Sequence, residues 1–260
     1  MNQTLINYTT HLADNTLILS QRNSEWCGHG PVLEQDIAIT NISLDLIGQA
    51  RSLYQYAAAL TNADNNRSPG RGEATEDSLA YLRDERHFKN CLITELPRGD
   101  WGQTILRQFF FSAYQYLLYG QLQRSSDPTL AAIAEKSMKE VTYHLRWSSE
   151  WVIRLGDGTD ESHARMLKAL DALWNYTGEF FIPAGYETAM AAAGIGVDVP
   201  ALQQSWRNKV QEIFQEATLP FPPAEPFMHT GGKTGLHTEY LGYILAEMQY
   251  LQRAYPGAEW

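Results

Sequence analysis

A near match to a metal-binding motif lies in the middle of the chain. Helical di-iron carboxylate proteins use a Glu-x-x-His motif twice, on facing helices of a bundle, where glutamate and histidine share one helix face. In the segment KEVTYHLRW (139–147), Glu140 stands four residues before His144, and Val141 stands three residues before it. Valine has no atom that binds iron, so this segment has the spacing of a metal-binding motif but lacks one of its ligands.

Two further segments offer side chains for the same chemistry. Counting from Glu85, the residue three positions later is Phe88, which cannot bind a metal. Counting from Asp84, the residue three positions later is His87, which gives one Asp-x-x-His match. Asp45 lies between two leucines and is a candidate for a further inward-facing carboxylate.

A complete di-iron site is not favoured, because it also needs a carboxylate from the third long helix. That helix has no acidic residue between Trp101 and Ser126. We therefore interpret four residues as a hydrogen-bonded polar core in a vacant metal cavity: Asp45, Glu85, Glu140 and His144. Buried carboxylates need partners, and the nearby candidates are Arg83, Arg86, Lys139 and Arg146. The alternative is a divergent di-iron oxidase that uses Asp84, His87, Glu140 and His144.

Other chemical motifs are weaker. Asp160-x-x-His163 lies at a predicted helix start, where an acidic residue is common without any ligand. The segment 26–30 (WCGHG) is interpreted as a turn, because adjacent Cys and His side chains rarely face one substrate. Cys27 and Cys91 form no CxxC motif, and no phosphate-binding glycine motif or nucleophile elbow is present.

Apolar residues recur every three or four positions through most of the chain, which predicts an all-α fold. The predicted helices cover 33–60, 76–96, 102–124, 128–155, 159–181, 186–193, 200–219 and 236–255. The first four are long helices and are expected to form a bundle, with the later helices packed around it. Residues 61–75 are polar and contain Gly and Pro, so a surface loop is expected there. We expect one domain over residues 1–260.

The amino-acid composition narrows the classes of molecule that the chain is expected to bind. The chain has 260 residues, 44% of them hydrophobic, and a formal net charge of −10. An acidic chain repels phosphate backbones, so nucleic-acid binding is not expected. The N-terminus has no basic segment followed by an apolar run, and no stretch approaches the ~20 apolar residues of a membrane span. We expect a cytoplasmic protein that has no membrane contact.

Five blocks carry a resemblance to a known family. They are SEWCGHGPVLE (24–34), LDLIGQAR (44–51), LRDERHF (82–88), KEVTYHLRW (139–147) and GGKTGLHTEYLGYILAEMQYLQRAYPGAEW (231–260). The chain resembles the C-type subunits of the bacterial 1,2-phenylacetyl-CoA epoxidases from about Leu17 to Trp260. The resemblance implies a ferritin-like helical bundle. It also implies a metal-free structural subunit that pairs with the catalytic A-type subunit, whose di-iron centre epoxidises the aromatic ring of phenylacetyl-CoA. A reductase subunit would bring electrons from NADPH.

The same resemblance implies a substrate contact at the subunit boundary. The matching positions are His87, Phe88, Lys89 and Asn90, together with Thr188, Ala189 and Met190. His, Lys and Asn side chains can donate hydrogen bonds to phosphate or pantetheine groups, but a solvated helix face would carry the same residues. A stand-alone acyl-CoA-binding module is therefore a second alternative. The tyrosine-rich last helix fits a protein interface and an ordinary core equally well.

Overall fold

The computed structural model describes residues 2–64, 72–222 and 227–258, and these residues form helices and no β-strand. The predicted all-α fold is confirmed. The α-helices are α1 (Asn2–Ser24), α2 (Leu33–Asn62), α3 (Glu76–Tyr81), α4 (Trp101–Leu122), α5 (Pro128–Gly156), α6 (Asp160–Leu173), α7 (Gly185–Ala192), α8 (Val199–Glu216), α9 (Glu239–Met248) and α10 (Tyr250–Ala254). Four short 3₁₀ segments are η1 (Glu85–His87), η2 (Leu92–Thr94), η3 (Trp174–Phe181) and η4 (Gly232–Thr234). Most of the predicted 61–75 loop, residues 65–71, lies outside the described residues.

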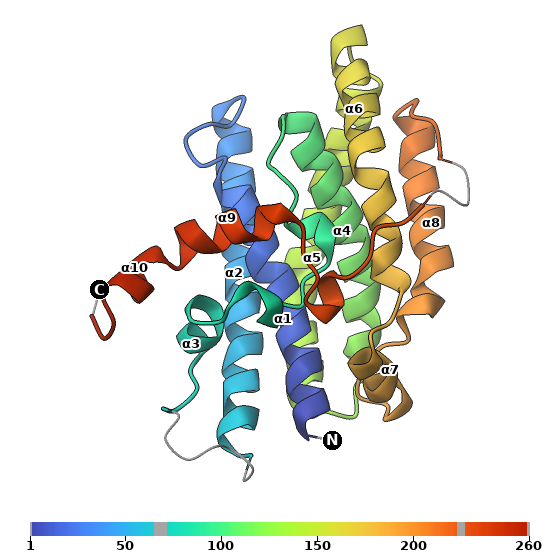
Figure 1. Cartoon of the computed structure of the whole chain (residues 1–260). Helices are drawn as coiled ribbons and strands as arrows, with labels where there is room; N and C mark the ends of the chain where they lie inside the picture. Colours follow the sequence, from blue (N-terminus) through green and yellow to red (C-terminus); the bar gives the residue numbers. More distant parts are fainter. Residues whose placement is uncertain (1, 65–71, 223–226, 259–260) are drawn as a thin grey trace.

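Four long helices form a ferritin-like bundle (Figure 1). Helix α1 packs along α2, and α4 packs along α5, while contacts between α2 and α5 join the two pairs. Helices α6 and α8 cover α4 on one side, and α7 packs against α1. Helices α9 and α10 cross the bundle at a steep angle and reach its side (Figure 1).

The start of α5 follows from its first residues. The carboxylate of Asp127 accepts hydrogen bonds from the backbone N–H groups of Thr129 and Leu130, both at 3.0 Å. Pro128 occupies the first helical position, where a missing N–H costs nothing. At the other end, a Cβ on Gly156 would lie 2.4 Å from the carbonyl oxygen of Ala217, so only glycine permits this approach to the end of α8.

Helix α4 is the central helix, as its apolar residues on all sides predict. Phe109, Phe110 and Phe111 are all buried, although they point in different directions around the helix. Each buried phenylalanine stabilises the fold by roughly 1.5–3 kcal/mol. Trp206 of α8 packs on this cluster, and its indole N–H donates to the carbonyl oxygen of Phe110 over 3.0 Å.

Helix α1 was not predicted, because its buried face is largely polar. Most of its side chains from Tyr8 to Asn23 are buried, and they include His11, Asp14 and Asn15. A stripe of apolar residues is the usual sign of a core-facing helix, and here that sign is weak. His11, Asp14 and Asn15 have hydrogen-bond partners in later segments of the chain, and α1 is the fourth helix of the bundle.

The predicted helix over 76–96 is wrong. Helix α3 begins with a capping box between Thr75 and Ser78 and ends at Tyr81. The chain then runs through η1, an extended stretch and η2. The predicted helix over 159–181 likewise changes into the 3₁₀ segment η3 after Leu173, and the last predicted helix is interrupted at Gln249. No helix in the described ranges is long and apolar enough to cross a membrane.

Candidate functional site

Two polar pairs link α2 to α5. The Nε2 atom of His144 lies 3.0 Å from Oδ2 of Asp45, and the amide of Gln49 donates to Oε2 of Glu140 over 2.9 Å. Residues four apart occupy adjacent turns of a helix, so the two pairs stack along neighbouring, antiparallel helices. We call these four residues the polar ladder.

Helix α4 extends the polar ladder with amide groups. The side-chain N–H₂ of Gln115 donates to Oε1 of Gln49 over 2.9 Å. Donation therefore runs in one direction, from Gln115 through Gln49 to the carboxylate of Glu140. Burial raises the pKa of the neighbouring Tyr119 hydroxyl, and the charge of Glu140 raises it further. The third long helix thus contributes hydrogen-bond donors where a di-iron site would need a carboxylate.

The residues of the polar ladder do not fit a di-iron centre. Val141 is fully buried and occupies the position where a Glu-x-x-His motif has its carboxylate. The Gln49 and Gln115 amide nitrogens are occupied as donors, and an N–H donor has no free lone pair for a metal. In the part of the chain that the structure describes, no three His, Cys, Asp or Glu side chains gather closely enough to hold a metal ion.

The structure brings together Asp45, Glu140 and His144 but not Glu85. Glu85 is exposed on η1, because residues 82–91 do not continue α3. The prediction that arginine or lysine side chains pair with the carboxylates of the polar ladder is also wrong, because Asp45 pairs with His144 and Glu140 pairs with Gln49. Arg83 instead binds Asp14 of α1.

A second polar cluster surrounds the extended stretch between η1 and η2. This stretch has no neighbouring strand, so its buried backbone groups need side-chain partners. Asp14 accepts from the backbone N–H of Lys89 over 2.8 Å, and Asn15 accepts from that of Cys91 over 2.8 Å. His11 donates through Nδ1 to the carbonyl oxygen of Lys89 over 2.7 Å. The polar face of α1 therefore fixes this stretch in its extended form.

Asp14 is the centre of this arrangement. It is fully buried, and it also accepts from the Tyr54 hydroxyl and from the Arg83 guanidinium. Burial lowers the pKa of Arg83, but the charges of Asp14 and Tyr54 outweigh this effect and raise it above its usual value. The Arg83 guanidinium also lies 4.1 Å above the ring of Phe88.

A buried ion pair joins α7 to η4. The ammonium of Lys233 lies 3.0 Å from a carboxylate oxygen of Glu187, and it also donates to the carbonyl oxygens of Phe180 and Ile182. Nε2 of His11 lies 3.5 Å from the same carboxylate. Burial raises the pKa of Glu187, but its interactions with His11 and Lys233 outweigh burial and lower it to about 2.

Two more buried carboxylates hold the chain on either side of the extended stretch. Glu179 accepts from the backbone N–H of Leu92 at 2.6 Å and from those of Gly231 and Gly232 at 2.8 Å. Glu95 lies 2.8 Å from Nδ1 of His237. Nε2 of His237 lies 2.9 Å from the carbonyl oxygen of Phe88, which can only accept, so both ring nitrogens donate. Burial lowers the pKa of His237, but Glu95 outweighs this effect and raises it.

A depression of about 400 Å³ opens at the surface above this cluster. Lys89 and Ala189 both line it, although they come from segments 100 positions apart in the chain. The Lys89 ammonium lies 5.8 Å from the centre of the Tyr186 ring. Partial burial lowers the pKa of Lys89, although Asp14 acts in the opposite direction. Among the described residues that line it, the depression combines one available cation, an aromatic wall and hydroxyl groups.

The other predicted substrate residues have different positions. His87 and Thr188 are exposed and do not line the depression. Phe88, Asn90 and Met190 are buried, and the Asn90 amide donates to Glu95 over 2.8 Å. Sequence reasoning missed the lining residues Thr4, Asn7, Tyr186 and Thr234. Of these four residues, only Thr234 lies in a segment that carries the family resemblance, the GGKTG block at 231–235.

Two weaker sequence motifs are structural. Residues 26–30 form the predicted turn, in which Gly28 has a φ of +77° and Nδ1 of His29 donates to the carbonyl oxygen of Cys27 over 3.0 Å. His163 donates to the carbonyl oxygen of Gly156 over 2.6 Å, which ties the start of α6 to the end of α5. Cys27 and Cys91 are both free thiols.

Comparison with known proteins agrees with this arrangement. A family model described as "Phenylacetic acid catabolic protein" matches residues 1–260. The chain is 49% identical over 260 residues to the C-type subunit of the 1,2-phenylacetyl-CoA epoxidase of Escherichia coli (strain K12), and the alignment covers 100% of both chains.

Proposed function

The chain belongs to the phenylacetic acid catabolic protein family, and we propose that it is a non-catalytic structural subunit of a phenylacetyl-CoA epoxidase. In this proposal it pairs with the di-iron subunit that epoxidises the aromatic ring during aerobic phenylacetate degradation. The iron belongs to that partner, and a reductase subunit supplies electrons from NADPH. The complex works in the cytoplasm.

The polar ladder is the observation that carries this proposal. Asp45, Glu140 and His144 lie on the facing helices α2 and α5, and facing helices of this kind supply the iron ligands in ferritin-like oxidases, but each of the three is already paired within the chain. Val141 and the amides of Gln49 and Gln115 replace the missing ligands with packing and hydrogen bonds. A bundle with this interior can keep its shape without a metal and can support a related chain that has one.

An exposed apolar stripe on α2 supports pairing with another helical chain. Leu33, Ile37, Leu44 and Ile47 are 72%, 52%, 61% and 39% exposed. Their spacings of four, seven and three residues fit a heptad seam in which Thr40 occupies the intermediate position, and such a seam suits a second helix laid along α2. An exposed apolar patch of this kind is typical of a protein interface. We assign this stripe to the partner subunit.

The depression at Lys89 supports a contact with the CoA part of the substrate. CoA carries phosphate groups, and a lysine ammonium is a suitable cation for them. Lys233 also lines the depression, but its ammonium is held by Glu187 and two carbonyl oxygens. Lys89 is therefore the cation that a CoA phosphate would meet at this surface.

Co-purification with metal analysis tests the structural role. The chain and its di-iron partner are co-expressed, and iron is measured in the complex and in each separated chain. We expect a stable complex, with iron in the partner and ring epoxidation only when both chains are present. Stoichiometric iron in this chain alone, or epoxidation by it alone, would support the oxidase alternative and refute the proposal.

Substitution of Lys89 tests the substrate contact separately. Lys89→Ala in the purified complex should raise KM for phenylacetyl-CoA about tenfold, the effect of one lost charge-assisted contact. Lys168→Ala, which removes an exposed lysine of α6, is the control and should leave KM unchanged. An unchanged KM for Lys89→Ala would remove the substrate contact from the proposal. Tight binding of CoA esters to the isolated chain would favour the acyl-CoA-binding alternative.

A further inference from the structure

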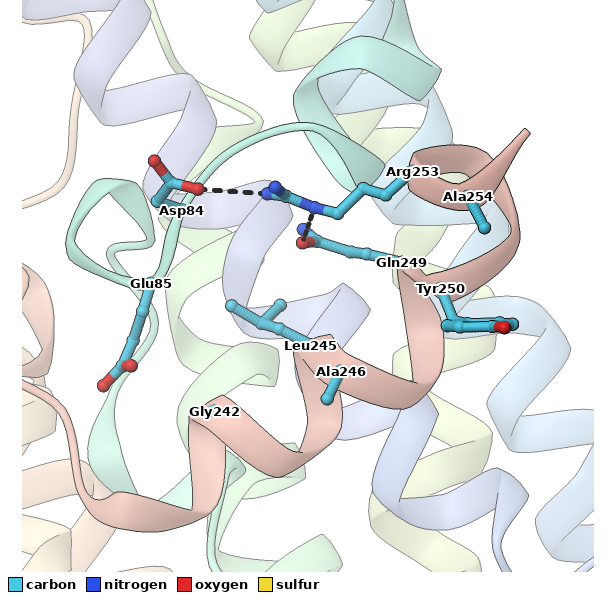
Figure 2. Close-up of a pocket in the computed structure, with 9 residues that line it drawn as sticks. All are labelled: Asp84, Glu85, Gly242, Leu245, Ala246, Gln249, Tyr250, Arg253 and Ala254. Atoms are coloured by element: carbon cyan, nitrogen blue, oxygen red, sulfur yellow. Dashed lines mark hydrogen bonds and ion pairs between the residues drawn. The ribbon is translucent and has the colours of Figure 1, made fainter. Parts of the chain in front are cut away.

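A groove of about 600 Å³ lies between the C-terminal helices and the turn at η1 (Figure 2). Gly242, Leu245 and Ala246 of α9 form its floor, and Asp84 and Glu85 stand on the opposite wall. The groove is separate from both the polar ladder and the depression at Lys89, since it shares no lining residue with them.

Two of the three floor residues, Gly242 and Ala246, have small side chains. A Cβ built on Gly242 would meet only the Oε2 atom of Glu85, at 3.6 Å, which is an ordinary contact distance. Glycine inside a helix costs roughly 1 kcal/mol relative to alanine. Gly242 thus weakens α9 slightly and leaves room above the helix for a side chain from another molecule.

Hydrogen bonds fix the shape of the groove. Arg253 of α10 donates to Asp84 over 3.1 Å and to Gln249 over 2.9 Å, as the dashed lines in Figure 2 show. The Gln249 amide in turn donates to the carbonyl oxygens of Ala80 and Arg83. A preformed groove binds without the entropy cost of ordering its walls.

The charge around the groove is negative. Asp84 neutralises Arg253, which leaves Glu85 without an ion pair among the described residues. Glu239 and Glu247 are exposed on α9 near its two ends. Arg86 is an exposed cation next to Glu85 in the chain, but the described residues that line the groove carry two carboxylates, Asp84 and Glu85, and one cation, Arg253. A ligand that brings lysine or arginine would complement this rim.

The surface beside the groove is aromatic. Tyr243 is 67% exposed on α9, and Tyr250, which lines the groove, is 64% exposed. Leu251 is 47% exposed on α10. Tyrosine is enriched in the centres of protein interfaces, because it combines apolar area with a hydrogen-bonding group. These exposed rings therefore point to a protein rather than a small anion as the occupant.

We propose that this groove docks a segment of the di-iron subunit that places an apolar side chain over Gly242 and a lysine or arginine beside Glu85. The identity of the partner rests on the proposed function. The chemistry of the docking segment rests on the charge and shape of the groove. The contact is additional to the apolar stripe of α2, and it fastens the C-terminal helices to the complex.

Two substitutions test the groove without removing any internal contact. Gly242→Leu fills the hollow and favours the helix, while Glu85→Lys reverses the unpaired charge on the rim. Each should weaken binding of the purified di-iron subunit about tenfold, measured as Kd by biolayer interferometry. Gly242→Ala adds one methyl group and should have little effect. Glu216→Lys on α8 is the charge-matched control and should leave Kd unchanged.

Two further measurements separate the possible outcomes. The weakening by Glu85→Lys should shrink as salt rises from about 0.05 to about 0.5 M, because salt at these concentrations increasingly screens interactions between exposed charges. The backbone amide hydrogens of α9 and α10 should exchange with solvent more slowly in the complex than in the free chain. Unchanged Kd values for both groove variants, with normal binding by the parent chain, would overturn the groove assignment alone. If the parent chain forms no complex, both the groove assignment and the proposed function are overturned.

Discussion

The buried pair of Glu187 and Lys233 gives a prediction whose size follows from the structure. We consider Glu187→Gln, which keeps the shape of the side chain and removes its charge. Glu187 is 1% exposed, so solvent screens its interactions with Lys233 and His11 very little. These interactions lower its pKa from 4.5 to about 2. That difference corresponds to about 3 kcal/mol of folding free energy at neutral pH.

The dependence on pH follows from the direction of the shift. A carboxylate whose pKa is lower in the folded state stabilises the fold fully above the unfolded value of 4.5. This stabilisation disappears as the pH falls from 4.5 towards 2. Between about pH 6 and pH 3.5, the contribution of Glu187 should fall by about 1 kcal/mol.

Urea unfolding of the two proteins over this pH range measures the effect. Groups that do not contact Glu187 titrate alike in both proteins, so the difference in unfolding free energy reports position 187 together with its partners His11 and Lys233. We expect the parent chain to be more stable by about 3 kcal/mol at pH 6 and by about 2 kcal/mol at pH 3.5. A difference that stays constant across this range would refute the assignment of a charged, stabilising Glu187. Glu161→Gln, at an exposed position of α6, is the control and should show almost no difference at either pH.

Three other predictions follow from buried polar groups. Asp14→Ala should lower the unfolding free energy by about 3–5 kcal/mol in urea titration, because it leaves the Arg83 charge without its partner; a loss below about 1 kcal/mol would contradict this role. The pKa of His237 is raised above 6.5, so its stabilisation is present below pH 6.5 and is lost as the pH rises through the folded value. The parent chain should therefore lose stability relative to His237→Gln between about pH 6 and 9 in urea titration, and a gain would show that the sign is wrong. Val141→Glu should destabilise the fold by roughly 3 kcal/mol without giving stoichiometric iron, because α4 still offers only amides. Iron found by elemental analysis in that variant would refute our interpretation of the polar ladder.

Much of the bundle could be predicted from the sequence, because most of its helices have apolar stripes and clear ends. The start of α5 at Asp127-Pro128 is one case, and the all-round apolar face of α4 is another. Helix α1 could not be found in this way. Its buried positions carry His11, Asp14 and Asn15, whose partners lie about 75 residues further along the chain.

The same long-range partners explain the error at residues 76–96. Local preference favours a continuous helix there, but the backbone after Phe88 bonds to side chains of α1 and to Glu179. Contacts between segments so far apart in the chain leave no sign in the local sequence pattern. The polar ladder was partly predictable, because Asp45, Glu140 and His144 could be selected as inward-facing candidates. Gln49 and Gln115 were missed because only carboxylates and histidines were considered as members of a metal cavity.

The polar face of α1 also has a consequence for the order of folding. Its buried charges find partners in segments near residues 83–91 and 187, and these segments are in turn held by residues 231–237. Contacts between distant parts of a chain form late, because closing long loops costs entropy. A growing chain on the ribosome can pack α1 along α2 early, but the buried charges of α1 have no partners until nearly all of the chain has been synthesised. The two ends of the polypeptide must therefore fold together, as one cooperative unit.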